Sequence, residues 1–308
     1  PAPRASAGVL DASIVVCTYR RPALLGELLD SLPPQRNPHG GIEVIVVDNS
    51  EVEPAAAVVA ARVEGFAAAG MTLRRVVERR EGVSHARNCG VAEAAGDVIV
   101  FIDDDERSQP GWLEALLAPF TVPGLGADMV GGEVDPDFGS ARRPDWLTDN
   151  LLQVYSCRWG WDTEARFLEP REWFGEGNCA VRATLFAGRS FDTGLGRSGA
   201  SLMGGEGGLF LEMREAGAKA WFEPAARVWH RIHAERLTKR WMLRRMLFQG
   251  MSDCRVERTL KRRTKIHPVS IDLAKFGGQD IDAMDRQNIA AMTYLYYNLG
   301  YVLASNLD

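Results

Sequence analysis

The sequence predicts an α/β fold in which a mostly parallel β-sheet is flanked by helices. Three observations predict this class. Runs of β-branched residues alternate with helix-like segments over the first 134 residues, most of these runs are almost continuously apolar, and polar residues follow several of them directly. A strand that is apolar throughout is buried on both faces, which is typical of a parallel sheet covered by helices.

The elements of the first half can be assigned in chain order from local patterns. The apolar runs predict strands at 13–17, 42–47, 71–77, 98–102 and 128–134, with helices at 22–32, 54–69, 84–95 and 110–120 between them. Pro22 has the fixed backbone angle that suits a first helical turn, and leucines at helical spacing follow it. The second helix is rich in alanine, and Ser84 is a suitable N-cap for the third.

From about Ser140 onward this regular alternation stops. A stretch rich in tryptophan and turn residues leads to a helix near 209–216, to short strands at 220–222 and 227–230, and then to a basic helical region. A last helix is expected at about 285–303. The sequence therefore predicts a helical C-terminal extension behind the α/β part.

The composition is that of an ordinary globular protein. The chain has 308 residues, of which 46% are hydrophobic and 25% are charged. No apolar run approaches the roughly 20 residues that a membrane-spanning helix needs, and the first eight residues lack the apolar core of a signal peptide. The five cysteines form no CxxC pair, which favours reduced thiols over a zinc site. We therefore expect a cytoplasmic protein.

The net charge of −5 conceals an asymmetry along the chain. Between Arg236 and Lys265 there are eleven Lys or Arg against two acids, a net charge of +9, which leaves −14 on the rest. Basic and apolar residues are mixed at helical spacing there. This segment, 236–265, is predicted to make peripheral contact with the anionic inner face of a membrane. The alternative is a helix that packs through its apolar residues and leaves its arginines in solvent. Nucleic-acid binding is not indicated, because no stacking surface or known motif accompanies the charge.

Four consecutive acids, at 103–106, follow directly after the fourth predicted strand. Adjacent carboxylates repel one another, so such a run is either a solvated turn or a site for a cation. Carboxylate oxygens suit Mg²⁺ or Mn²⁺, which usually complete their shell with water and substrate phosphates. Polar segments also follow the first two strands, at 18–21 and 48–50, and ligands bind where parallel strands end. We therefore expect all three segments to line one crevice. Asp48 either contributes to binding there or is only a cap or turn residue.

Four segments of the first half form a recognisable set. They read SIVVCTYRRP at 13–22, VVDNS at 46–50, GVSHARNCG at 82–90 and FIDDD at 101–105, the last followed by PGWL at 110–113. In order and spacing this set resembles the family 2 glycosyltransferases of the GT-A fold, closely from 13 to about 117 and more loosely from 175 to 250. The resemblance implies an N-terminal tail at 1–12, a catalytic domain at 13–235 and a helical C-terminal region at 236–308. Within the catalytic domain it implies a Rossmann-like nucleotide-sugar-binding half at 13–134 and an acceptor half at 135–235.

The resemblance also implies which residues bind the nucleotide of the sugar donor. The loop of Thr18, Tyr19 and Arg20, together with Asp48, is expected to hold the nucleotide base. Arg87 matches the arginine that approaches the nucleotide in the family.

The run of acids is divided among several roles by the same resemblance. Asp103 and Asp105 match the two acids of the family's D-x-D motif, so Asp103 is expected to face the ribose and Asp105 to bind the metal. Asp104, in the variable middle position, is placed with the donor-binding residues, and Glu106 is expected to lead the next helix. The expected cofactor is Mn²⁺ or Mg²⁺.

Two further residues complete the predicted site. An inverting transferase needs a general base for the acceptor hydroxyl, and the family usually supplies it from a Glu-Asp pair opening a helix after a glycine-rich segment. Here that stretch reads MGGEGGL at 203–209, so Glu206 is the candidate base, and Gly207 stands where the second acid would be. The alternative role of Glu206 is to cap the helix. His230, at the end of the strand predicted at 227–230, is the candidate histidine ligand of the metal.

These features predict a metal-dependent inverting glycosyltransferase that moves a sugar from a UDP- or GDP-linked donor to a hydroxyl of a polysaccharide, lipid-linked or small-molecule acceptor. One alternative is a non-catalytic or donor-hydrolysing nucleotide-sugar-binding protein on the same fold, which would account for Gly207. Another is an Asp-nucleophile phosphatase, which also carries Asp-x-Asp after a strand. Phosphatases of that type place the motif on the first strand, whereas Asp103 follows the fourth.

Overall fold

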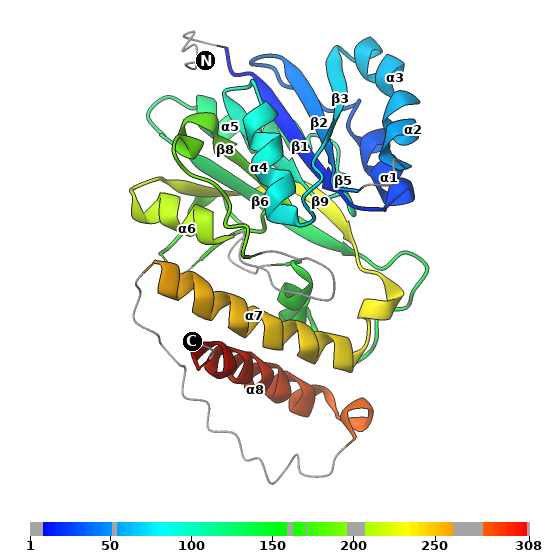
Figure 1. Ribbon diagram of the computed structural model, residues 1–308, viewed down its shortest axis with the longest axis vertical. Coiled ribbons are helices and arrows are strands. Elements are labelled where there is room, and N and C mark those ends of the chain that lie inside the picture. The colour runs from blue at the N-terminus through cyan, green and yellow to red at the C-terminus, as the bar shows by residue number, and fades with distance from the viewer. Residues whose placement is uncertain are drawn as a thin grey trace.

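The protein is built around one curled β-sheet, seen in a computed structural model that describes residues 9–50, 54–158, 163–170, 172–195, 207–260 and 280–306 (Figure 1). Along the sheet lie β3 (Met71–Val77), β2 (Ile42–Asp48), β1 (Ala12–Thr18), β4 (Val98–Ile102), β8 (Asn178–Arg182), β6 (Met129–Asp137), β9 (Ala220–Arg231) and β5 (Glu106–Ser108), and β7 (Arg166–Phe167) pairs with β9. The predicted α/β class, with helices flanking the sheet, is confirmed.

The first four strands form the parallel half of the sheet. β1 pairs in parallel with β2 and β4, and β2 pairs in parallel with β3. Successive residues of β1 enter two different cores, because Ile14 and Val16 pack on one face of the sheet and Val15 packs on the other. This two-sided burial explains the continuous apolar runs of the sequence.

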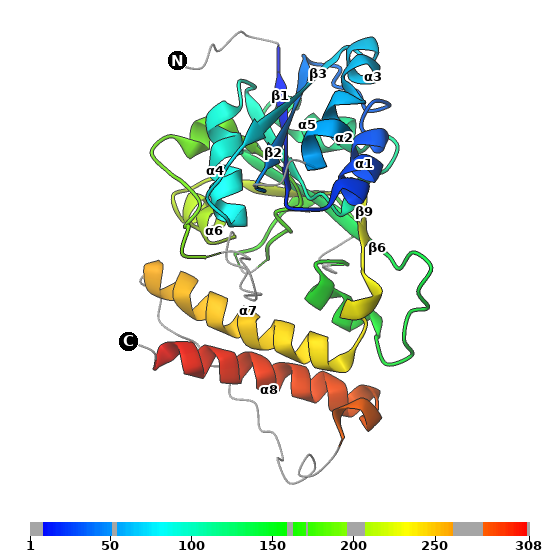
Figure 2. The same cartoon turned by 45° about the vertical axis from the view of Figure 1, so that its right-hand side comes forward.

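Helices cover both faces of this half (Figure 2). One core contains side chains from α1 (Pro22–Ser31), α2 (Pro54–Ala60), α3 (Val63–Ala68) and α5 (Trp112–Thr121), and the other contains side chains from α4 (Val83–Glu93) and α6 (Gly207–Glu215). The single helix expected at 54–69 is wrong, because a turn at Ala61 and Arg62 divides it into α2 and α3. At this turn Arg62 Nε donates to Asp30 Oδ1 of α1 over 2.7 Å. This bond holds the turn between α2 and α3 against α1.

The second half of the sheet is mixed in direction. β8 runs antiparallel between β4 and β6, β9 runs parallel to β6, and β5 and β7 are antiparallel to β9. The two short strands expected at 220–222 and 227–230 are one strand, β9, whose pairing with β6 shifts between Gly132 and Glu133. The shift accommodates the residues between the two predicted strands.

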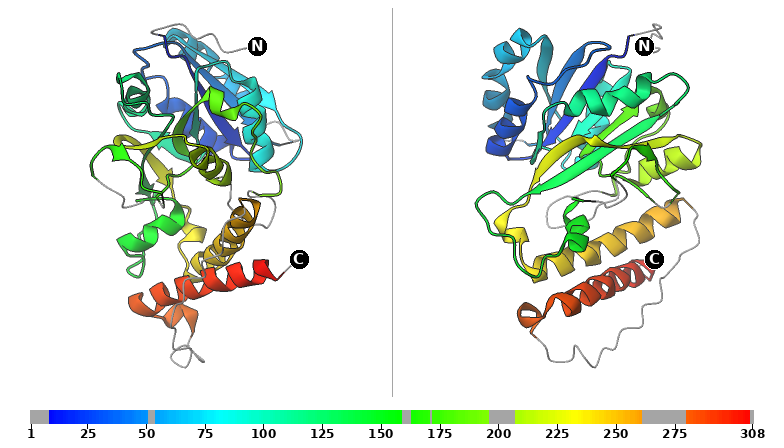
Figure 3. Two further views of the ribbon diagram at one scale, coloured as in Figure 1. Left: turned by 90° about the vertical axis from the view of Figure 1, so that its left-hand side faces the viewer. Right: turned by 180° about the vertical axis from the view of Figure 1, so that it is seen from behind.

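Two long helices, α7 (Lys239–Thr259) and α8 (Arg286–Ser305), lie side by side and run in the same direction below the sheet in the view of Figure 1 (see also Figure 3). Their backbones touch at two glycines. A Cβ on Gly250 would lie 1.9 Å from the carbonyl oxygen of Tyr297, and a Cβ on Gly300 would lie 1.9 Å from that of Leu247. Only glycine permits so close an approach of two backbones. The predicted helical C-terminal extension is therefore a tightly packed pair.

Short 3₁₀ segments connect these elements, namely η1 (Asp149–Tyr155), η2 (Ala183–Phe186), η3 (Ala234–Arg236) and η5 (Ile281–Ala283). Among the residues that the structure describes, no helix is both long enough and apolar enough to cross a bilayer.

Candidate functional site

The polar segments that follow β1, β2 and β4 meet at one edge of the sheet. Thr18, the last residue of β1, lies opposite Asp48, the last residue of β2. The Thr18 hydroxyl donates to Asp104 Oδ2 over 2.8 Å, which joins the loop after β1 to the acids after β4. Arg21 Nη1 then bridges Asp104 Oδ1 at 2.9 Å and Asp105 Oδ2 at 3.2 Å. The structure thus brings the three predicted segments together.

Asp105 is a buried carboxylate surrounded by positive or hydrogen-bonding groups. Besides Arg21, its Oδ2 faces Arg236 Nη1 at 3.7 Å, and its Oδ1 faces His230 Nε2 at 3.6 Å. Burial alone would raise the pKa of Asp105, but His230, Arg21 and Arg236 outweigh it and hold the pKa well below its usual range. Asp105 is therefore ionised and available as an oxygen ligand.

His230 is held in one orientation by the backbone of η1. Its Nδ1 lies 3.0 Å from the carbonyl oxygen of Tyr155 and 3.6 Å from Cys157 Sγ. A carbonyl can only accept, so Nδ1 donates to it and Nε2 is the ring nitrogen that faces Asp105, where it would offer its lone pair to a bound cation. Metal-binding histidines typically have this second hydrogen bond to a backbone carbonyl.

Asp105 Oδ1 and His230 Nε2 fit a shared divalent cation. Two neighbouring ligand atoms of one Mg²⁺, each bonded at about 2.1 Å, lie roughly 3 Å apart, and here they are separated by 3.6 Å. Among the described residues no cluster of three or more His, Cys, Asp or Glu has the arrangement of a metal site. Mg²⁺ and Mn²⁺ commonly take only one or two protein ligands and complete their shell with water and phosphate oxygens. The donor set therefore suits a cation that binds together with a diphosphate.

Asp103 is the most accessible of the three aspartates, with a side chain 45% exposed. Its Oδ1 accepts from Arg87 Nη2 at 3.2 Å, and the Arg87 side chain is only 5% exposed. A Cβ on Gly177, just before β8, would lie 2.7 Å from Asp103 Oδ2 and 2.9 Å from Glu106 Oε1. The absent side chain at Gly177 therefore leaves room for both acids.

Asp104 and Glu106 face inward. Asp104 has one oxygen on Thr18 and the other on Arg21, and burial raises its pKa to about 7. Glu106 was expected to lead the next helix, but it is the first residue of β5 and lies opposite His230 in the sheet. Its Oε2 accepts from the Asp103 backbone N–H at 3.1 Å, and burial, together with the charges of Asp103 and Asp105, raises its pKa. The prediction for Glu106 is wrong because pairing with β9 draws this residue into the sheet.

The end of the site at β2 is formed around Asp48, which is almost fully buried. Asp48 Oδ2 accepts from Arg75 Nε at 3.0 Å, and Oδ1 accepts from the backbone N–H of Ser50 at 3.3 Å. On the rim, Tyr19 is exposed, and the guanidinium of Arg20 lies over its ring at 5.0 Å from the centroid. The expected contacts of Asp48, Tyr19 and Arg20 with the nucleotide base stay predictions.

Residues 13–186 match the family described as Glycosyl transferase family 2. The chain belongs to this family. It is 32% identical over 256 residues to the succinoglycan biosynthesis protein ExoM of Rhizobium meliloti, covering 80% of this chain and 75% of that relative. It is 28% identical over 249 residues to the glucosyl-dolichyl phosphate glucuronosyltransferase of Haloferax volcanii, covering 79% and 76%. The predicted enzyme class, a glycosyltransferase, is confirmed.

Solved structures show the same fold. The mannosyltransferase PcManGT from Pyrobaculum calidifontis, in complex with GDP-Man and Mn²⁺, superposes with a TM-score of 0.57 at 18% identity, covering 97% of this chain and 74% of that one. Residues 1–349 of S. aureus TarS give a TM-score of 0.55 at 14% identity, covering 97% and 92%. The predicted GT-A fold of the family 2 glycosyltransferases is confirmed.

The candidate base of this glycosyltransferase, Glu206, lies outside the described residues. The helix expected to follow it, near 209–216, is α6, which begins at Gly207. The role of Glu206 stays a prediction.

Three residues of the candidate site were not predicted to lie there, namely Tyr155, Gly177 and Arg236. Arg21 is the last residue of the predicted polar segment 18–21, but the sequence analysis gave it no role of its own, although the four acids needed counter-charges. Arg236 was counted only as part of the basic segment 236–265. Tyr155 acts through its backbone carbonyl and Gly177 through a missing side chain, so neither leaves a chemical signature in the sequence.

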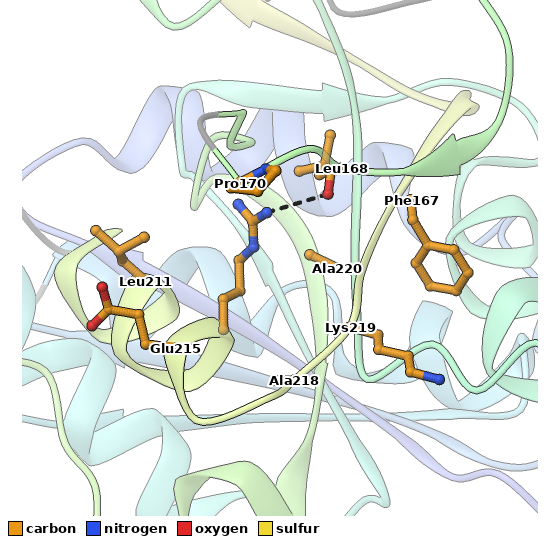
Figure 4. A pocket seen from close by; sticks show the side chains of 9 residues that line it. Phe167, Leu168, Pro170, Leu211, Glu215, Ala218, Lys219 and Ala220 are labelled. Atoms are coloured by element: carbon orange, nitrogen blue, oxygen red, sulfur yellow. Dashed lines mark hydrogen bonds between the residues drawn. The ribbon is translucent and has the colours of Figure 1, made fainter.

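The glycosyltransferase also has a hollow of about 560 Å³ between β7 and α6 (Figure 4). Its lining includes Phe167, Leu168, Leu211 and Arg214, and Arg214 Nη2 donates to the Leu168 carbonyl at 3.3 Å. None of its lining residues belongs to the predicted donor site. The hollow is therefore separate from the acids after β4.

Proposed function

We propose that the protein is a metal-dependent inverting glycosyltransferase that uses a UDP- or GDP-linked sugar and acts in the assembly of a polysaccharide or lipid-linked glycan. The main support is the pairing of Asp105 with His230. Asp105 Oδ1 and His230 Nε2 lie 3.6 Å apart, beside the Arg87–Asp103 ion pair. The names of the two relatives support a glycan or lipid-linked acceptor. Structural neighbours crystallised with GDP-Man and Mn²⁺, or with UDP and Mn²⁺, support the donor and the cofactor.

In this proposal the nucleotide lies across the ends of β1 and β2, with its base near Asp48 and its ribose near Asp103. Asp105 and His230 would hold Mn²⁺ or Mg²⁺, which neutralises charge on the departing diphosphate when it is bound. Arg87 orients Asp103 toward the donor through their 3.2 Å contact.

The acceptor hydroxyl attacks the anomeric carbon from the side opposite the diphosphate. A bond forms between the acceptor oxygen and that carbon while the bond to the diphosphate oxygen breaks, which inverts the configuration. Glu206 accepts the hydroxyl proton as general base.

The test is a panel of UDP- and GDP-sugars assayed with Mn²⁺, with Mg²⁺ and with a chelator, alongside calorimetry with UDP and GDP. We expect one nucleotide to bind only with metal, and its sugar to be transferred with inversion. Metal-dependent binding without transfer to any acceptor would favour a donor-binding or donor-hydrolysing protein. Turnover of a generic phosphate ester that is lost in Asp103→Asn would favour a phosphatase.

We also propose that the C-terminal helix pair contacts an anionic lipid surface, chiefly through α8. Several cations of 236–265 point inward: Arg236 faces Asp105, and Lys239 Nζ donates to the carbonyls of Asp282 and Met284 at 2.6 Å each. In contrast, α8 has no charged residue after Arg286 and exposes four large apolar side chains, Tyr294, Leu299, Val302 and Leu303. The neighbouring helix α7 exposes four arginines, Arg240, Arg244, Arg255 and Arg258. Apolar residues beside arginines suit an anionic membrane surface.

Co-flotation with liposomes tests this surface. The wild type is expected to float with vesicles rich in phosphatidylglycerol and to stay behind with pure phosphatidylcholine. The double variant Leu299→Asp, Leu303→Asp should bind at least about 10-fold more weakly, because two charges would enter the interface. Val63→Asp, an exposed apolar position on α3, is the matched control and should float as the wild type does. Equal flotation of the double variant would contradict the proposal.

A further inference from the structure

Tyr155 contacts both the candidate metal ligand His230 and the first turn of α7. It is the last residue of η1, and its side chain and backbone are buried. Its carbonyl accepts from His230 Nδ1 at 3.0 Å, and its hydroxyl donates to the Arg236 carbonyl at 3.0 Å. Its ring stacks on that of Trp241 with centroids 5.2 Å apart and planes inclined by 18°.

Trp241 also contacts a neighbour of Asp105, the other candidate metal ligand. The guanidinium of Arg236 lies over its ring, 5.9 Å from the centroid, while Arg236 Nη1 lies 3.7 Å from Asp105 Oδ2. Trp241 is fixed at the start of α7, where its backbone N–H donates to Thr238 Oγ1 at 3.2 Å. One indole ring therefore supports the neighbours of both His230 and Asp105.

The start of α7 is in turn anchored to the segment that leads into α8. Lys239 Nζ donates to the carbonyls of Asp282 and Met284, and the two helices cross closely at Gly250 and Gly300. The position of Trp241 thus depends on the whole helix pair, which lies outside the part of the chain that matches the family, 13–186.

We infer that Trp241 and Tyr155 form a positioning unit through which the C-terminal helix pair fixes the orientation of His230 and the place of Asp105. Both are positioning residues, because their rings stack on each other and Trp241 and the Tyr155 hydroxyl contact Arg236, which in turn faces Asp105. The inference rests on the proposed metal site, because its consequence for activity requires that His230 and Asp105 bind the cation. Partners that orient a metal-binding histidine typically contribute about 10- to 100-fold to metal affinity or activity.

The test uses the full chain and the variants Trp241→Ala, Trp241→Phe, Tyr155→Phe and Phe167→Ala. Trp241→Ala removes the ring beneath Tyr155 and Arg236, whereas Trp241→Phe keeps an aromatic ring there. Tyr155→Phe keeps the ring and the carbonyl but loses the hydroxyl bond to Arg236. Phe167→Ala is the matched control, since it breaks an aromatic pair with Trp221, 4.9 Å between centroids, outside this unit.

Two readouts are measured after circular dichroism has verified folding. The first is the Kd of Mn²⁺ in the presence of UDP or GDP, by calorimetry or electron paramagnetic resonance. The second is the ¹⁵N NMR signal of His230 Nδ1 in metal-free protein, which reports its hydrogen bond to the Tyr155 carbonyl; the His230 signal is assigned by its loss in His230→Gln.

We expect Trp241→Ala to weaken Mn²⁺ binding about 10- to 100-fold and to shift the ¹⁵N signal of His230 Nδ1, because its hydrogen bond to the Tyr155 carbonyl is no longer held in place. Trp241→Phe should restore both readouts to within a few-fold of the wild type, Tyr155→Phe should show an intermediate loss, and Phe167→Ala should show none. A folded Trp241→Ala with wild-type Mn²⁺ affinity and an unchanged His230 signal would overturn the inference. If Trp241→Ala does not fold, wild-type readouts in Tyr155→Phe would overturn it.

The failure of this inference and that of the proposed function can be told apart. If the wild type binds no Mn²⁺ with either nucleotide, the proposed metal dependence fails. The Nδ1 signal of His230 in the variants then still decides whether Trp241 and Tyr155 position it.

Discussion

Asp105→Ala is expected to lower sugar transfer at least about 10²-fold and to remove metal-dependent nucleotide binding. The substitution deletes the carboxylate whose Oδ1 faces His230 at 3.6 Å, and so deletes one of the two proposed protein ligands of the cation. It also leaves Arg21 and Arg236 without the charge between them. The measurement is the initial rate of transfer with the preferred donor, together with calorimetric titration of its nucleotide in the presence and absence of Mn²⁺.

The control for this experiment is Asp145→Ala, which removes an exposed carboxylate paired only at the surface with Arg142 at 3.5 Å. That variant should keep wild-type transfer and wild-type nucleotide binding. Because Asp105 is buried, thermal unfolding of both variants must show a folded protein. A folded Asp105→Ala that still binds nucleotide in a metal-dependent way would refute the assignment of Asp105 as a ligand.

Glu206→Gln is expected to lower turnover about 10²- to 10⁴-fold while donor affinity stays within a few-fold of the wild type. The amide keeps the size and hydrogen-bonding ability of the side chain but cannot accept the proton of the acceptor hydroxyl. Turnover is measured with saturating donor, and donor affinity is measured separately by calorimetry with nucleotide and metal.

Glu212→Gln is the matched control for Glu206→Gln, because Glu212 is an exposed acid of α6 that pairs with Arg189 at 3.3 Å. We expect it to retain full turnover. An equal loss of donor affinity and turnover in Glu206→Gln would move Glu206 to the donor-binding residues. Unchanged turnover would require a different base and would leave Glu206 as a helix-capping residue.

The parallel half of the sheet was predictable because its cause is local. Each of β1, β2 and β4 is apolar enough to be buried on both faces, and the polar residues at the ends of these strands follow from the direction of the chain. The convergence of Thr18, Asp48 and the acids after β4 needed only the rule that parallel strands end at one edge.

The mixed half was less predictable because its cause is non-local. β5 consists of Glu106, Arg107 and Ser108, which have no strand pattern and become a strand only by pairing with Val228 to His230. The same pairing buries Glu106 beside Asp103 and places His230 near Asp105. The sequence could suggest His230 as a ligand, but the carbonyl that orients it belongs to Tyr155, in a segment without periodicity.

The counter-charges of the acids illustrate the same limit. The sequence presents the acids without partners, and the structure supplies Arg21 from the loop after β1, Arg87 from α4 and Arg236 from η3. Each arginine is ordinary in its own segment. Only the packing of three distant segments around β4 brings them to the candidate donor site.

The central position of β4 has a consequence for synthesis on the ribosome. Its partner on one side, β1, is made first, but its partner on the other side, β8, begins at Asn178. At a translation rate of roughly 5–20 residues per second, the edge of β4 waits about 4–15 s for that strand. All five residues of this edge, Val98–Ile102, are apolar and buried in the finished protein. An unpaired apolar edge can associate with other chains, so the nascent chain is exposed to aggregation while it ends between β4 and β8.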